Sequence, residues 1–110
     1  MATELAAARA LTHFAALRSE RTADAGRLAS EAKAYASDAG WRVPDASIQV
    51  HGGIGFTWEH DLHFFLKRGR ANAGFWGDAK WHRERVADAV LAAMRAHPLG
   101  RDAACIGQVI

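Results

Sequence analysis

The chain has 110 residues, enough for one domain with one core, and half of them are hydrophobic. Fourteen basic and 12 acidic residues give a formal net charge of +2, too small to select nucleic acid or an anionic membrane as a partner. The single cysteine, Cys105, rules out an internal disulfide, and no apolar run approaches the roughly 18 to 20 residues of a membrane span, so a cytoplasmic location is expected.

The composition favours helices over strands. Alanine is the most common hydrophobic residue, β-branched residues are few and proline occurs twice. We therefore expect an all-α fold, an incomplete up-down helical bundle with three main helices and one short helix. The bundle is expected to occupy residues 1–100, and residues 101–110 to form a tail.

The first half of the chain predicts two of the main helices. From Ala2 to about Ser19, apolar residues recur three or four positions apart, the spacing of one helix face: Leu5, Ala8, Leu11 and Ala15. The same spacing continues from Thr22, the expected N-cap, to Val50, over about eight turns at 3.6 residues per turn.

Two residues are expected to disturb this long second helix. Pro44 lacks the backbone donor that the preceding turn requires, and its ring clashes with that turn. Gly40 weakens the same region by roughly 1 kcal/mol relative to alanine. We therefore expect a kink near Val43.

A short helix and a final main helix are predicted in the second half. The short helix lies within WEHDLHFFLKRGR, residues 58–70. Three glycines are then expected to break the chain: Gly69, Gly74 and Gly77. The last helix is predicted from Asp78 to about His97, before Pro98.

The predicted helices need a partner for their apolar faces. Each main helix carries a broad apolar stripe, and four tryptophans must be covered in a small protein. The large aromatic residues of the second half are expected in the core or at a subunit interface: Trp58, Phe64, Phe65, Trp76 and Trp81. Self-association, or union with a missing segment, is therefore expected.

The stretch HGGIG, residues 51–55, directly follows the second predicted helix. Glycine adopts the left-handed conformation at a helix C-terminus without steric cost, so helix termination is the simplest interpretation. The stretch matches neither a Walker A loop nor G-x-G-x-x-G after a strand. However, the paired Gly52 and Gly53 also let a phosphate approach the backbone closely, and Gln49 offers a hydrogen-bond donor and acceptor. Both interpretations remain open.

Histidines near this stretch raise the question of a metal site. His51, His60 and His63, with Glu59 and Asp61, place five potential ligands within 13 positions. The H-x-x-H spacing lacks the i, i+4 pair and glutamate of H-E-x-x-H, and no cysteine is nearby. No metal site is predicted, and the acidic residues are expected to complement the dipole of the short helix.

The segment QVHGGIGFTWEHDLHFFLKR, residues 49–68, closely resembles the C-terminal domain of the acyl-CoA dehydrogenases, and residues 1–95 resemble it more loosely. The resemblance implies part of a four-helix bundle through which subunits associate, in an FAD-dependent enzyme that oxidises acyl-CoA to enoyl-CoA. It also implies that the N-terminal helical domain, the β-domain and the first bundle helix are missing. A fragment, a truncated product or one piece of a split protein is therefore expected, inactive alone.

The resemblance assigns a role to the glycine stretch. Gln49, Gly52 and Gly53 would lie against the ADP part of an FAD molecule bound mainly by a neighbouring subunit. That subunit would be a second copy or another acyl-CoA dehydrogenase chain. The alternative is a helical association module that has lost flavin binding.

The resemblance fails at the catalytic base. Many members of the family carry a glutamate before the last helix in Y-E-G-T, and alignment on Gly77 places Trp76 at that position. No catalytic residue is therefore predicted here: the base comes from an upstream helix or a partner subunit, or no dehydrogenation occurs. The segment G-D-x-x-x-H-R resembles actinobacterial-type members, some of which are pairs of unlike subunits. Asp78 is expected to be an N-cap, and His82 a surface or core residue.

Overall fold

The computed structural model describes residues 1–20 and 22–104, and its elements are all helical. The four α-helices are α1 (Ala2–Arg18), α2 (Ala25–His51), α3 (Leu62–Gly74) and α4 (Ala79–Ala96). Two short 3-10 helices follow α2 and α4: η1 (Gly52–Phe56) and η2 (Pro98–Gly100). The prediction of an all-α fold with three main helices and a shorter one is confirmed.

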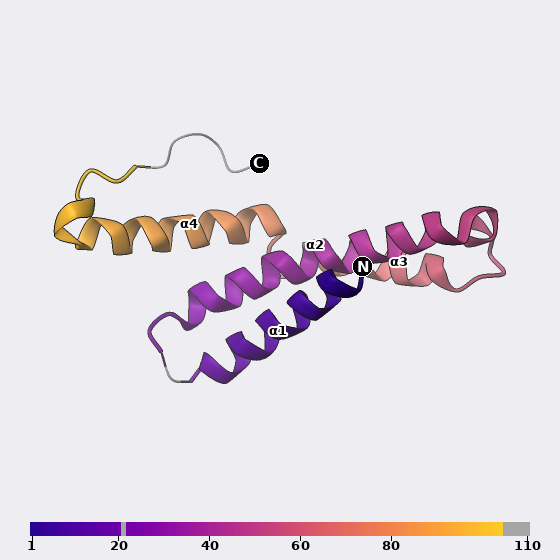
Figure 1. Ribbon diagram of the computed structural model, residues 1–110, viewed down its shortest axis with the longest axis horizontal. Coiled ribbons are helices and arrows are strands. Elements are labelled where there is room, and N and C mark those ends of the chain that lie inside the picture. The colour runs from indigo at the N-terminus through magenta and orange to yellow at the C-terminus, as the bar shows by residue number, and fades with distance from the viewer. Residues whose placement is uncertain (21, 105–110) are drawn as a thin grey trace.

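The long helix α2 is the centre of the structure. Helices α1, α3 and α4 each pack against it, with α1 running beside it from its start as far as Arg42 and α3 running back along its second half (Figure 1). The result is elongated, with principal extents of 59 × 33 × 24 Å. No described helix is both long and apolar enough to cross a membrane.

The buried core is small and lies on α2. Its apolar members are Leu28, Ala32, Ala34, Ala39 and Ile48. Helices α1 and α3 have no buried residue, and none of the four tryptophans is buried. The expectation that tryptophans fill the core is therefore wrong, because the alanines of α2 allow the flanking helices to pack closely and leave the large rings outside. A subunit interface for them stays a prediction.

The start of α2 differs from the sequence-based expectation. The helix begins at Ala25 with Asp24 as its N-cap residue, and Asp24 makes no side-chain capping bond. Thr22 is not the N-cap, because its hydroxyl donates instead to the carbonyl of Arg18 at 3.3 Å. Thr22 therefore contacts the last residue of α1 instead of capping α2.

Pro44 does not end α2, which continues to His51, so the predicted kink near Val43 does not interrupt the helix. Proline leaves the carbonyl of Gly40 without its usual helical donor. Gly69 of α3 lies against this carbonyl, and a Cβ added at Gly69 would overlap it and would lie 3.2 Å from the Cα of Trp41. The expectation that Gly69 breaks the chain is therefore wrong; its missing side chain lets α3 approach α2.

Helix α3 begins four residues after Trp58, its predicted start. Residues 57–61 instead form a turn in which the hydroxyl of Thr57 donates to the carbonyl of Ile54 at 2.8 Å. The Leu62 N–H donates to Nδ1 of His60 at 3.3 Å, which satisfies a free donor at the start of the helix. These local side-chain bonds compete with helix formation over the polar run.

Residues after α4 are described only to position 104. The carbonyl of Ala103 accepts a hydrogen bond from Nε of Arg95 at 2.9 Å, so the first part of the predicted tail contacts α4. The rest of the tail, with Cys105, lies outside the described residues.

Candidate functional site

The predicted cofactor residues lie where α2 ends. Gly52 follows the last residue of α2 with φ of 63° and ψ of −140°, and its N–H donates to the carbonyl of Gln49. This geometry confirms that Gly52 terminates the helix. Gln49, on the last turn of α2, is exposed, as is Gly53. Gln49, Gly52 and Gly53 therefore lie close together at the end of α2.

The three glycines of the stretch differ in whether the fold requires a glycine at their position. Gly52 is required by its positive φ, which residues with a side chain rarely adopt. Gly55 is buried, and a Cβ there would lie 2.8 Å from the carbonyl oxygen of Ile48. Gly53 has no positive φ, and a Cβ added there would meet nothing within 4 Å. Nothing in the described chain thus requires a glycine at position 53.

The N–H of Gly52 is already used inside the chain. It donates to carbonyls of α2, so it does not point outward as a free donor. The contribution of Gly52 to any bound anion is therefore to remove a side chain, rather than to supply a hydrogen bond. A polar contact from this surface would have to come from Gln49 or from the backbone after Gly52.

The histidines near the glycines contact one another and their local backbone. The rings of His51 and His60 lie 4.8 Å apart, and Nδ1 of His51 is 2.7 Å from the carbonyl oxygen of Ser47. Nδ1 of His63 is 2.8 Å from the carbonyl oxygen of His60. Within residues 1–20 and 22–104, no three His, Cys, Asp or Glu side chains are placed to hold a metal ion.

Trp76, at the position expected for the catalytic base, lies in the loop between α3 and α4. Its φ is 62°, a left-handed conformation that is rare for a bulky residue, and its side chain is 90% exposed. Nε2 of the buried His82 lies 3.0 Å from the Trp76 carbonyl oxygen. Gly77 follows with φ of 97°, and a Cβ there would overlap the ring of Trp81. The loop is therefore held from α4 and presents an indole ring to solvent.

The two polar residues near Trp76 each make a contact within this part of the chain. One carboxylate oxygen of Asp78 accepts a hydrogen bond from the Trp81 N–H at 2.8 Å, which confirms Asp78 as the N-cap of α4. His82 is buried, so it is a core residue, which was one of its two expected placements. Its contact with the Trp76 carbonyl was not predicted, and only its position one turn after the cap hinted at it.

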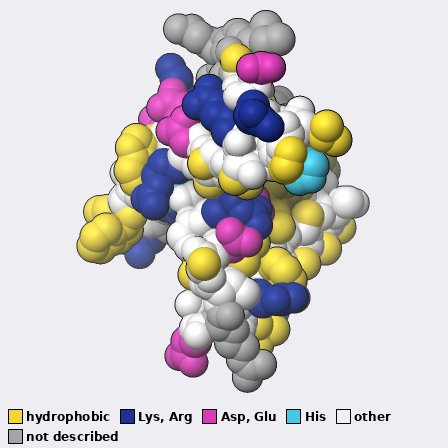
Figure 2. Space-filling view, turned by 90° about the vertical axis from the view of Figure 1, so that its left-hand side faces the viewer, with side chains coloured by type: hydrophobic (Ala, Val, Ile, Leu, Met, Phe, Trp, Pro, Cys, Tyr) yellow, Lys and Arg dark blue, Asp and Glu magenta, His cyan; other side chains and the backbone are white. Residues whose placement is uncertain are grey.

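Basic side chains cover the other tryptophans. Three ring–cation contacts of 4.3 to 4.8 Å are present: Lys67 over Trp58, Arg70 over Trp41 and Arg85 over Trp81. No such contact involves Trp76 in the described part of the chain. At the end of the molecule seen in Figure 2, basic, acidic and hydrophobic side chains are mixed, without one broad patch of a single charge.

The glycine surface and Trp76 lie at opposite ends of α3. The helix has 13 residues, which corresponds to a length of about 20 Å at 1.5 Å per residue. The two features are therefore separated by the length of α3 and do not form one compact centre.

Comparison with known proteins identifies relatives along most of the chain. The family model described as acyl-CoA dehydrogenase, C-terminal domain, matches residues 1–91. The acyl-CoA dehydrogenase IpdE2 of Mycolicibacterium smegmatis is 32% identical over 83 residues, which are 76% of this chain and 25% of that protein. The acyl-CoA dehydrogenase FadE34 of Mycobacterium tuberculosis is 48% identical over 58 residues, 52% of this chain and 8% of that protein.

A third relative matches a longer part of the chain. The probable acyl-CoA dehydrogenase FadE25 of Mycobacterium tuberculosis is 29% identical over 92 residues, 83% of this chain and 24% of that protein. The chain thus spans about a quarter of the length of IpdE2 and FadE25. No solved structure matches it.

Proposed function

Because the chain belongs to the acyl-CoA dehydrogenase family, we propose that it is the portion of such an enzyme that contacts FAD and joins subunits. The complete enzyme would oxidise an acyl-CoA to the enoyl-CoA, and FAD, when bound, supplies the hydride acceptor. The isolated chain is expected to be inactive, since it spans only about a quarter of its relatives' length.

Gly53 is the observation that supports a cofactor contact. Its conformation does not require glycine, and no atom of the described chain occupies the space that a Cβ would fill. Because the fold does not require a glycine at this position, the missing side chain leaves room for a group from outside the chain. Gly52 also has no side chain, so it adds to the open space near the exposed Gln49. The surface therefore fits close approach by a pyrophosphate.

Each residue of this surface would have a distinct role. Gly52 and Gly53 would let the phosphates approach the backbone. Gln49 would donate its amide N–H to a phosphate oxygen or accept from a ribose hydroxyl. Most of the cofactor's contacts would come from a neighbouring subunit, either a second copy or another acyl-CoA dehydrogenase chain.

The catalytic base is proposed to come from outside this chain. Trp76 has no proton-accepting group, and one oxygen of the Asp78 carboxylate caps α4. An upstream helix or the partner subunit would therefore supply the carboxylate that takes the α-proton of the acyl-CoA.

The second candidate function is a helical association module without flavin. The Gly52 N–H supports this second function, because it already donates to carbonyls of α2 and is not available to an anion. The two functions are separated by purifying the chain with a co-expressed acyl-CoA dehydrogenase subunit and measuring flavin absorbance. Flavin in the assembly supports the first function, whereas an assembly that forms without flavin supports the second.

A further inference from the structure

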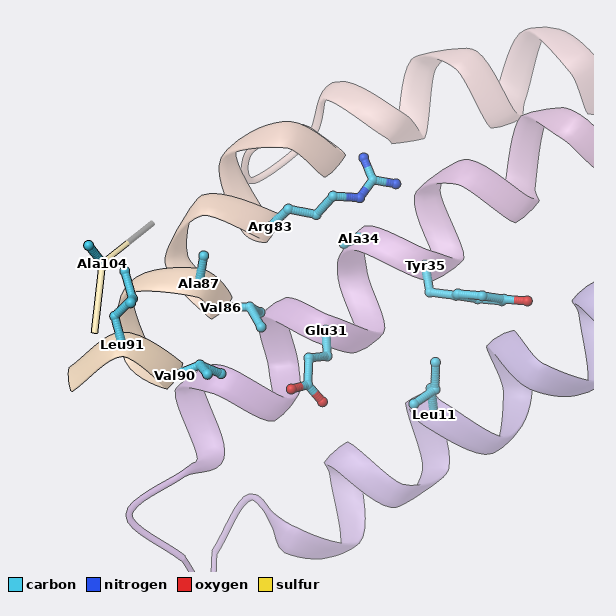
Figure 3. Close-up of a pocket in the computed structure, with 10 residues that line it drawn as sticks. All are labelled: Leu11, Glu31, Ala34, Tyr35, Arg83, Val86, Ala87, Val90, Leu91 and Ala104. Atoms are coloured by element: carbon cyan, nitrogen blue, oxygen red, sulfur yellow. The ribbon is translucent and has the colours of Figure 1, made fainter. Parts of the chain in front are cut away.

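An apolar groove lies between α1 and α4, on the side of α2 where these two helices face each other (Figure 3). Its volume is about 760 Å³. Leu11 lines it from α1, Tyr35 lines it from α2, and α4 contributes branched side chains: Val86, Val90 and Leu91. Removal of such apolar surface from water is favourable, so the groove can bind a further apolar segment.

The two charged side chains that line the groove already have partners within the chain. Glu31 forms an ion pair with Arg27 of the same helix, and Arg83 of α4 forms an ion pair with Asp38 of α2. Neither charge therefore requires an ion from outside. The occupant that fits the groove has no charged side chain, because a charge placed among these apolar residues would lose its water without gaining a partner.

The chain turns back against α4 immediately after that helix ends. Gly100 packs against the last turn of α4, where an added Cβ would overlap the carbonyl of Met94. The Gly100 N–H donates to the carbonyl of His97 at 2.9 Å, and the Ala103 N–H donates in turn to the carbonyl of Gly100 at 3.0 Å. Nε of Arg95 donates to the Ala103 carbonyl at 2.9 Å. These contacts hold the end of the described chain against α4.

The last described residue, Ala104, is itself part of the lining of the groove. The sequence continues with CIGQVI, residues 105–110, in which no side chain is charged and three are large and aliphatic: Ile106, Val109 and Ile110. Six extended residues reach about 20 Å. Val86 and Leu91, on the α4 wall, are separated by only about 7.5 Å along the helix at 1.5 Å per residue. The segment therefore starts at the groove, matches its apolar lining and is long enough to follow this wall.

We propose that residues 105–110 bind in the groove between α1 and α4 of the same molecule. Because Ala104 tethers the segment at the groove, its effective concentration there is high, and it competes well with any occupant from solution. The aliphatic side chains of the segment would leave water together with the valines of α4. A partner subunit would then have to bind elsewhere or displace the segment. The proposal is independent of flavin and of the proposed function.

Cys105, the single cysteine of the chain, is a built-in probe for this contact. While the segment is bound, the thiol is covered, and its reaction with an aromatic disulfide reagent requires release of the segment. The reaction rate of the full, folded chain is therefore expected to be at least about tenfold below that of a free peptide with the sequence AACIGQVI, residues 103–110.

Two substitutions, one on each side of the contact, should release the segment. Val90→Glu places a carboxylate in the groove, and Ile106→Ser removes a large apolar side chain from the segment. Each should raise the thiol reaction rate at least about fivefold. Val90 is 42% exposed, so Val90→Glu should keep the helical circular dichroism of the wild type. Ile106→Ser changes no residue of the four α-helices, so it tests the contact even if Val90→Glu fails to fold.

Val50→Glu and Gln108→Ser are the matched controls. Val50 is 73% exposed on α2 and does not line the groove, and Gln108 is the polar side chain of the segment, so both variants should react at the wild-type rate. A wild-type rate equal to that of the free peptide would overturn the proposal. So would a rate that fails to rise in folded Val90→Glu or in Ile106→Ser. Protection that is lost on dilution of the protein would also overturn it, because another copy would then be covering the thiol.

Discussion

The imidazole of His82 lies within hydrogen-bond distance of the Trp76 backbone carbonyl, with Nε2 3.0 Å from the oxygen. A carbonyl accepts, so Nε2 carries the proton that is donated. A buried histidine on α4 thus holds the one non-glycine residue with a positive φ among the described residues. Trp76, which the sequence resemblance predicts at the position of the base, thus has a backbone contacted by His82 and a solvent-facing ring.

Replacement of Trp76 by glycine is expected to stabilise the fold. The left-handed conformation costs a bulky residue about 1–2 kcal/mol, and glycine's greater freedom in the unfolded chain offsets about 0.5–1 kcal/mol of the relief. Because the side chain is 90% exposed, little burial is lost. Trp76→Gly should therefore raise the free energy of unfolding, measured by urea denaturation, by about 0.5–1 kcal/mol.

Trp58→Gly is the control for this prediction. Trp58 is also exposed, at 78%, but its φ is not positive and its ring contacts Lys67 and His63. This variant should lower the free energy of unfolding. If both variants were destabilised equally, strain at Trp76 would not be the cause.

Gly69 and Gly40 should respond in opposite directions to alanine. Gly69→Ala places a methyl group on the Gly40 carbonyl and should destabilise the α2–α3 contact by about 1–3 kcal/mol. Gly40→Ala adds a methyl group in open space within a helix and should stabilise by up to about 1 kcal/mol. Thermal unfolding at matched protein concentration measures both, and destabilisation by Gly40→Ala would argue against this packing.

Asp78 is expected to act as a helix cap rather than as a base. Asp78→Ala should lower the free energy of unfolding by about 1 kcal/mol, whereas Asp78→Asn, which still accepts from the Trp81 N–H, should not. In an active assembly with a partner subunit, Asp78→Asn should also keep the rate of acyl-CoA oxidation. A large rate loss with unchanged stability would instead identify Asp78 as the base.

Substitutions at Gly52 and Gly53 are expected to have different effects on stability, because only Gly52 is required by the fold. Gly52→Ala forces a side chain into a positive φ and should cost about 1–2 kcal/mol of unfolding free energy. Gly53→Ala should leave stability nearly unchanged, because its Cβ meets nothing. Equal destabilisation by both would show that the fold itself needs Gly53, and would remove the main support for a cofactor contact.

The main helices were predictable because their apolar spacing is long and regular, as in α2 and α4. Their ends were harder to place. Thr22 is a good capping residue in isolation, but its hydroxyl bonds back to α1. The turn before α3 contains polar residues that also suit a helix start, and the bonds made by Thr57 and His60 decide against it.

The candidate site stays a prediction, and the structure adds backbone detail that the sequence does not contain. The sequence locates Gln49 and the glycines, but it cannot show that the Gly52 N–H is used internally while Gly53 is open. From the sequence, Gly69 resembles a helix breaker. The reason for this glycine is its close approach to Gly40, which is distant in the chain and therefore cannot be identified from the local sequence. Nothing in the local sequence predicts a tryptophan with a positive φ.

The most direct test of the central claim is the flavin content of the chain purified with its partner subunit, compared between Gly53→Asp and Gly40→Asp. Both glycines are exposed and open, but only Gly53 lies on the proposed cofactor surface. A carboxylate at Gly53 would repel a pyrophosphate, so that variant should lose flavin while Gly40→Asp keeps it. Full flavin retention by Gly53→Asp in an intact assembly would contradict the contact.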